Sequence, residues 1–265
     1  MARVKKKSVA TTGKELQSWD QELEGYAQNA IDKESGTGGG NYISTKNGNF
    51  TYKGDNIESP IPAVVLDSIL DYAYYTTTYD DDKPTSPACF AIGIDEKTMQ
   101  PHSDCAEPQS DLCHTCWANK YKSDDRGKGK ACKNQRRLAV VNAEVLEDID
   151  ENAEIAMLRV SPTSLKYWSG YVKKIGTVLR RPPFAVVTEI SIEPEKSYHI
   201  LKFNLRSKIP DGMLGTMKKL MDQCQNDLSA GYPAFEEEIE EAPKKKLSRK
   251  ATPKKKQVVK KKRKF

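Results

Sequence analysis

Short apolar or alternating segments recur between residues 42 and 205, and this pattern predicts a series of β-strands. Segments 42–46 and 49–53 flank Asn47-Gly48, whose residues tolerate the positive φ angles of a tight hairpin turn. Residues 63–79 are apolar and aromatic without a clear period, although the Tyr and Thr residues of their second half favour a strand. Further strands are predicted at 88–94, 137–142, 154–160, 185–192 and 198–205.

Two segments have the period of an amphipathic helix instead. Apolar residues recur at spacings of three and four from Leu165 to Leu179, between a Ser161-Pro162 start and a Pro182-Pro183 stop. A second apolar series from Met213 to Leu228 marks the last helix. About seven strands with two packing helices predict a mainly β fold with added α (α+β), for which an OB-like small barrel is the leading candidate.

Composition divides the chain into three parts. Only 37% of the residues are apolar, below the average of roughly 45–50% for globular proteins, which indicates that part of the chain lies outside a core. We expect a flexible, basic and Gly-rich leader at 1–41 and one ordered domain at 42–232. The tail, 233–265, is acidic and then basic and is predicted to be disordered. Neither a secretory signal nor an apolar run of about 20 residues is present, so we expect a cytoplasmic protein.

Charge is distributed unevenly along the chain. Of the 43 Lys and Arg residues, 13 lie in 243–265, a segment without Asp or Glu. The other 242 residues hold 30 basic and 37 acidic side chains, a formal charge of −7, although the whole chain is +6. A nucleic-acid surface on this acidic body must therefore be a local patch, and residues 117–137 supply one, with eight Lys and Arg against two Asp.

The same region, 102–141, contains four of the six cysteines and two of the three histidines. Cys113 and Cys116 form a C-x2-C pair, and Cys132 follows at a distance suited to a third zinc ligand. The fourth ligand would come from upstream, as His102 or Cys105. The alternatives are a set of unconnected thiols and, less favoured, a redox-active C-x2-C pair. We predict one structural Zn²⁺ that clips the loop 102–137.

No catalytic signature accompanies this predicted metal site. The zinc deaminase pattern is absent, as are a nucleophile elbow, a P-loop and an HExxH motif. Asp80–Asp82 is the only candidate carboxylate cluster for a divalent ion, and a solvated turn is the simpler interpretation. We therefore expect no enzymatic activity and no catalytic residues.

Clustered cations with aromatic rings are typical of proteins that bind single-stranded nucleic acid, because phosphates need charge and unpaired bases stack on rings. The alternative is that about half of the strand aromatics are core residues and that Arg136 and Arg137 pair with acidic groups. The candidate DNA-binding residues are Trp117, Lys120, Tyr121, Lys122, Arg126, Lys128, Lys130, Lys133, Arg136 and Arg137, together with Tyr52 and Tyr74.

Several segments together resemble phage-encoded single-stranded DNA-binding proteins: GGGNYISTKNGNFTYKG (38–54), VVLDSILDYAYY (64–75), PACFAIG (87–93), the C-x2-C pair with RGKGKACKNQRRLAVV (126–141), and RPPFAVVTEI (181–190). The resemblance covers roughly residues 38–230. It implies an OB-type domain that coats single strands during phage replication or recombination. It also implies that Cys113, Cys116 and Cys132 bind the metal, with His102 as fourth ligand or Cys105 in its place. Trp117 departs from the pattern, which has proline after the second knuckle cysteine.

The predicted function is therefore non-enzymatic binding of single-stranded DNA by a basic groove with aromatic stacking, in the cytoplasm of an infected bacterial cell. One alternative is a zinc-ribbon adaptor for a replication or recombination protein, and a second is a metal-dependent nuclease. The tail, with its acidic run 236–241, is a candidate contact for such partner proteins. KKKRK at 260–264 also resembles a nuclear localisation signal, which gives a minor alternative location.

Overall fold

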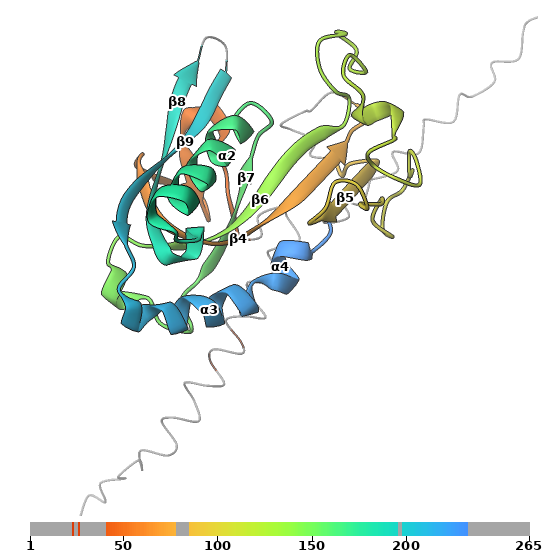
Figure 1. Ribbon diagram of the computed structural model, residues 1–265. Helices are drawn as coiled ribbons and strands as arrows, with labels where there is room; N and C mark the ends of the chain where they lie inside the picture. Colours follow the sequence, from red (N-terminus) through yellow and green to blue (C-terminus); the bar gives the residue numbers. More distant parts are fainter. Residues whose placement is uncertain (1–22, 24–25, 27–40, 78–84, 196–197, 233–265) are drawn as a thin grey trace, which may run out of the picture. The chain divides into compact units, whose positions relative to one another are not determined.

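The computed structural model describes residues 23, 26, 41–77, 85–195 and 198–232; the predicted leader and tail fall almost wholly outside these residues. The described part has a mixed α+β fold built on a curled half-barrel sheet (Figure 1). The strand order is β1-β7-β6-β4-β8-β9, and β5 also pairs with β4. β2 (Phe50–Tyr52) and β3 (Asp55–Ile57) form a separate hairpin.

The central strand of the sheet is β4 (Ile61–Tyr74), so the segment whose type the sequence left open is extended throughout. It pairs with β6 (Lys133–Asn142) along most of its length, with β8 (Val186–Glu195) at its start and with β5 (Cys89–Gly93) at its end. A β-bulge between Val65 and Asp67 bends it, as an extra residue in one strand does. Beyond the bulge, β5 and the adjoining halves of β4 and β6 project from the half-barrel as an arm (Figure 1).

The remaining strands agree with the predicted positions. β7 (Ile155–Val160) is antiparallel to β6, and β9 (Tyr198–Lys208) is antiparallel to β8. β1 (Tyr42–Ile43) adds a parallel partner at the outer edge of β7. The sheet therefore ends at β1 on one side and β9 on the other.

The turn at Asn47-Gly48 adopts the expected positive φ angles, 56° and 78°. Its flanking strands are shorter than predicted, because only Ser44 and Thr51 pair across it. β2 turns instead at Lys53-Gly54, a second positive-φ pair, and pairs with β3. Two adjacent turns thus divide a segment that the sequence pattern assigned to one hairpin.

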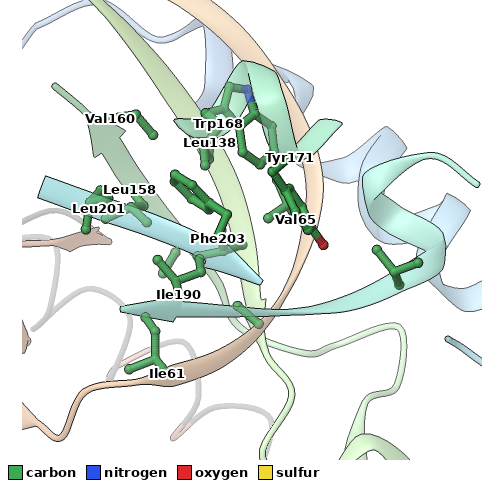
Figure 2. Close-up of a cluster of buried hydrophobic side chains, with 14 of the residues drawn as sticks. Ile61, Val65, Leu138, Leu158, Val160, Trp168, Tyr171, Ile190, Leu201 and Phe203 are labelled. Atoms are coloured by element: carbon green, nitrogen blue, oxygen red, sulfur yellow. The ribbon is translucent and has the colours of Figure 1, made fainter. Parts of the chain in front are cut away.

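The concave side of the sheet is filled by α2 (Leu165–Lys174), which continues as a π-helical turn to Leu179. Its buried residues Trp168 and Tyr171 pack toward Phe203 of β9, with 5.1 Å between the ring centroids of Trp168 and Phe203 (Figure 2). The spacing of three along α2 places both rings on the face that meets the sheet. The interior of the half-barrel is therefore a packed core.

The convex side is covered by α3 (Leu214–Gln223) and α4 (Gln225–Ser229), which together form the predicted last helix with a break at Cys224. Met217, Leu220 and Leu228 are buried against the outward residues of β4, β6 and β7. No described helix has the length and apolar character needed to cross a membrane.

Candidate nucleic-acid interface

The cysteine-rich segment forms the connection between β5 and β6, residues 94–132, which we call the cysteine loop. Its described regular structure is limited to a short 3-10 turn at Trp117–Asn119. Backbone N–H groups of His102 and Glu107 donate to the carbonyls of Phe90 and Ala88, both at 2.8 Å. The loop therefore covers the outer edge of β5 in place of another strand.

Four cysteines line one small cavity of about 20 Å³ between the arm and the loop: Cys89, Cys113, Cys116 and Cys132. All are free thiols. Burial raises the pKa of the Cys89 thiol to about 11 and those of Cys113 and Cys132 to about 12, and neighbouring cysteines add to each shift. In the described part of the chain, no three His, Cys, Asp or Glu side chains are close enough together to hold a metal ion as they stand.

The two upstream candidates for the fourth ligand have other contacts, although the Cys105 thiol is also a neighbour of Cys89 and Cys113. The His102 ring stacks on Phe90, with 4.9 Å between the ring centroids, and its Nδ1 accepts the backbone N–H of Asp104. Cys105 lies at the edge of β5, where its Sγ is 3.0 Å from both the backbone N and the carbonyl O of Phe90. Neither residue lines the four-cysteine cavity.

Trp117 and Tyr74, two of the predicted stacking residues, are brought together by the fold. Their rings meet edge to face, with centroids 5.5 Å apart. Trp117 follows the knuckle directly and is 46% exposed, while its Nε1 donates to Gln109 Oε1. Tyr121, a few residues on, is also well exposed. An anchored ring with an open surface is the kind of platform on which an unpaired base stacks.

The basic tip of the loop is organised by a carboxylate. Asp124 Oδ1 accepts the backbone N–H groups of Lys128 and Gly129 at 2.7 and 2.8 Å. These bonds, that from Gly129 first, lower the pKa of Asp124. With its backbone folded back in this way, the tip exposes four predicted DNA-binding cations: Lys120, Lys122, Arg126 and Lys128. Of these, only Arg126 pairs with a carboxylate of the described chain, with 3.7 Å between its Nε and Asp124 Oδ2.

The other predicted cations lie closer to the sheet. Lys130 donates to Asn119 Oδ1 and Lys133 donates to the carbonyl of Lys130, so both help to hold the loop. Arg136 is half-buried, and burial lowers the pKa of its guanidinium. It makes no hydrogen bond or ion pair with the described residues. A half-buried guanidinium without a partner lowers the stability of the fold, and it is suited to bind an incoming anion.

Arg137 and Tyr52, two of the predicted DNA-binding residues, instead make contacts inside the fold. Arg137 is fully buried and pairs with Asp71, because its side chain points to the convex face, opposite to that of Arg136. Tyr52 belongs to the β2–β3 hairpin, packs against the concave core and donates its hydroxyl to Glu154. Burial and this bond raise the pKa of Tyr52. Both residues have structural partners and lie apart from the Trp117–Tyr74 pair.

Asp71 is the centre of a buried polar cluster that the sequence pattern did not reveal. Its Oδ2 accepts from Arg137 and from Arg159 Nε at 3.2–3.3 Å, and its Oδ1 accepts the Tyr232 hydroxyl at 2.8 Å. Arg159 also lies over the rings of Tyr232 and Tyr42. The cluster joins β4, β6 and β7 to the chain segment that follows α4.

Cys89 is the second residue that sequence spacing missed. It lies 24 positions before Cys113, far outside the C-x2-C spacing, and only the pairing of β5 with β4 brings it to the cavity. The available signal was its place at the start of a buried strand, next to the segment that carries the other cysteines. Comparisons with protein-family models, with curated proteins and with solved structures found no match to this chain.

Proposed function

We propose that this protein binds single-stranded DNA, without catalysing a reaction, on the surface formed by the cysteine loop and the concave side of the arm. The observation that carries the proposal is the exposed Trp117 ring, held against Tyr74 and followed by lysines that lack a described carboxylate partner. Rings of this kind bind bases of any sequence, and the lysines attract the phosphate backbone.

The strand connectivity supports an OB-like barrel as the framework of this surface. Five strands of the sheet lie side by side in the order β7-β6-β4-β8-β9. Along the chain, α2 lies between β7 and β8, which are the third and fourth of these five strands in sequence. This order resembles that of a five-stranded, partly open Greek-key barrel, in which the loops between the first two and the last two strands contact oligonucleotides. The cysteine loop belongs to the first of these connections, which runs from β4 through β5 to β6.

The outer sheet face that such barrels also use is covered here. α3 and α4 pack on the convex side, and Tyr232 lies over Arg159 and Asp71 of the same face. Because the convex face is covered, the proposed binding surface is that of the loop and the concave side of the arm.

Arg136 continues this surface toward the half-barrel. It pairs with Leu70 across the sheet, on the face that carries Tyr72 and Tyr74. A groove of about 450 Å³ opens beside Arg136, and Lys173, Val172 and Phe184 also line it. The Arg136 guanidinium has no partner among the described residues, so a phosphate bound there, with an adjoining base in this groove, would extend the path from Trp117.

The test is fluorescence anisotropy of the full chain with oligo(dT), with Trp117→Ala as the variant. We expect a loss of about 1–3 kcal/mol, which is roughly a 5- to 150-fold weaker affinity. Val145→Ala, which removes another exposed apolar side chain in the connection between β6 and β7, is the control and should leave the affinity unchanged. Equal weakening by both variants, or equal affinity of the wild type for single- and double-stranded oligonucleotides, contradicts the proposal.

Removal of residues 236–265 separates this surface from the charged tail. Retained oligo(dT) binding is expected if the loop and arm form the binding site. Complete loss favours the adaptor alternative, and Mg²⁺-dependent cleavage of the oligonucleotide favours the nuclease alternative. A role in phage DNA replication or recombination rests on the family resemblance and forms part of the same proposal.

A further inference from the structure

Cys89 and Cys132 occupy matching positions on either side of the end of β4. Cys89 pairs with Tyr74 on one edge of the strand, and Cys132 immediately precedes Lys133, which pairs with Ala73 on the other edge. Cross-strand partners point to the same face, so both cysteines face the side of the arm on which Tyr74 lies. The cysteine loop places a further pair of thiols over that face.

That pair comes from the C-x2-C turn. The backbone N–H of Cys116 donates to the carbonyl of Cys113 at 3.3 Å, which closes a tight turn, and both cysteines line the cavity between the loop and the arm. The N–H of Cys132 donates to the carbonyl of Ala118 at 2.9 Å, so the start of β6 is joined to the end of this turn. Strands and turn thus present two cysteines each to one cavity.

The size of this cavity suits one ion. A cavity of roughly 10–15 Å³ accepts one water-sized particle, and the one lined by the four thiols is about 20 Å³. Zn²⁺ binds four thiolates tetrahedrally at about 2.3 Å from each sulfur. Binding therefore requires the four sulfur atoms to turn inward from their present positions, and each thiol gives its proton to solvent as its sulfur binds the metal.

His102 does not complete this set, because it belongs to the other side of β5. Its ring stacks on Phe90, which alternates with Cys89 along the strand and therefore points to the opposite face. Cys105 has its own partners, since its thiol accepts from the N–H and donates to the C=O of Phe90. The Cys105 thiol is also a neighbour of Cys89, but only Cys89 lines the cavity together with Cys113, Cys116 and Cys132.

The cysteine loop also needs a crosslink. Loops of this length without helices or strands are uncommon in compact domains unless something holds them. The buried apolar cluster beneath the loop is small and consists of Tyr72, Ala91, Met99 and Cys113. A bound metal supplies the missing folding energy, as it does in other small metal-stabilised units.

We propose that Cys89, Cys113, Cys116 and Cys132 bind one Zn²⁺ as a closed, four-thiolate structural site that fixes the cysteine loop to the arm. In this ligand set, Cys89 takes the fourth position, for which the sequence analysis proposed His102 or Cys105. Because all four positions are filled by protein sulfur, the site has no open position for catalysis. The proposal does not depend on DNA binding.

The experiment is elemental analysis of the full-length protein purified without chelators, followed by exchange of the metal for Co²⁺ and its absorption spectrum. We expect about one zinc per chain in the wild type and its loss in Cys89→Ser. His102→Ala and Cys105→Ser should keep the zinc. Cys224→Ser is the matched control, because Cys224 is a buried free cysteine at the end of α3.

Cys89→His guards against a variant that merely fails to fold. It should keep one metal ion with a changed Co²⁺ spectrum, because an imidazole nitrogen replaces one sulfur ligand. A wild type without zinc, a Cys89→Ser variant that keeps it, or an unchanged Co²⁺ spectrum in Cys89→His would each overturn the proposal. Since metal content is measured without DNA, these outcomes are independent of those for DNA binding.

Discussion

Replacing Asp71 by alanine should be among the most destabilising single changes in this protein. Asp71 and Arg137 are both fully buried, and the Asp71 carboxylate also accepts from Arg159 and Tyr232. In Asp71→Ala the Arg137 guanidinium stays inside the fold without a counter-charge, which typically costs about 3–5 kcal/mol. This expected loss measures an unpaired charge and not the net gain from the ion pair, which an apolar pair of similar volume can match.

Urea unfolding measures this loss. With an m-value of about 3 kcal/mol/M, at the upper end for small proteins, the unfolding midpoint should fall by roughly 1–1.7 M with m unchanged. Asp211→Ala is the control, because its carboxylate also pairs with an arginine, Arg181 at 2.9 Å, but is 83% exposed. An exposed pair contributes about 0–1 kcal/mol, so the control midpoint should move little.

A second readout locates the effect. Arg137 Nη1 donates to the carbonyls of Leu228 and Ala230, so its displacement should release the chain after α4. Amide hydrogen exchange of residues 228–232 should therefore become faster in Asp71→Ala than in Asp211→Ala. Equal midpoint shifts in the two variants, or unchanged exchange at 228–232, would refute the reasoning.

The remaining predictions concern the turn, the core, a buried hydrogen bond and the tail. Gly48→Ala should lower the free energy of unfolding in urea by about 1–2 kcal/mol, because φ is +78° there. The added Cβ would also lie 2.5 Å from His199 Nε2, and a second change, His199→Ala, should restore only the part of the stability that this clash removes. Leu138→Ala, fully buried beneath α2, should cost about 2–5 kcal/mol by calorimetry, against at most about 0.5 for the exposed Leu205→Ala. Thr188→Val should cost about 1–3 kcal/mol by removing the partner of the buried Tyr171 hydroxyl, 2.6 Å away; no loss would mean that this hydroxyl finds another partner. Deleting residues 236–265 should reduce the steepness with which the logarithm of the oligo(dT) affinity falls against the logarithm of the salt concentration, by about 0.7 for each tail–phosphate contact. An unchanged slope would mean that the tail does not contact DNA.

Local sequence patterns were sufficient for most strands and both helical segments. The apolar series of residues 165–179 and the apolar segments at 137–142 and 154–160 form the predicted elements, because each must bury one side against a neighbour. Residues 63–79 were ambiguous, because a strand that meets neighbours on both faces is apolar throughout and loses its period of two. β4 is such a strand, with Val65 in the concave core and Val64 in the convex one.

Arg136 and Arg137 show what the sequence pattern could not decide. It gave both residues the same two candidate roles, contact with DNA or pairing with an acidic group. They are adjacent residues of the same type, and their difference arises only because neighbours on a strand point to opposite faces. One guanidinium meets Asp71, 66 positions away along the chain, and the other has no described partner. Which arginine faces an anion and which fills the core depends on the register of β4 with β6.

The sequence alone located the basic and cysteine-rich segment, its C-x2-C pair and Trp117 as a candidate stacking residue, because these features lie close together along the chain. Only the tertiary structure brought Tyr74 to Trp117 and Cys89 to the cavity between the arm and the loop, and placed His102 on the other face of β5. The physical reason is that such neighbours are set by strand pairing and side-chain alternation. These relations connect residues at any separation and leave no spacing in the sequence to recognise.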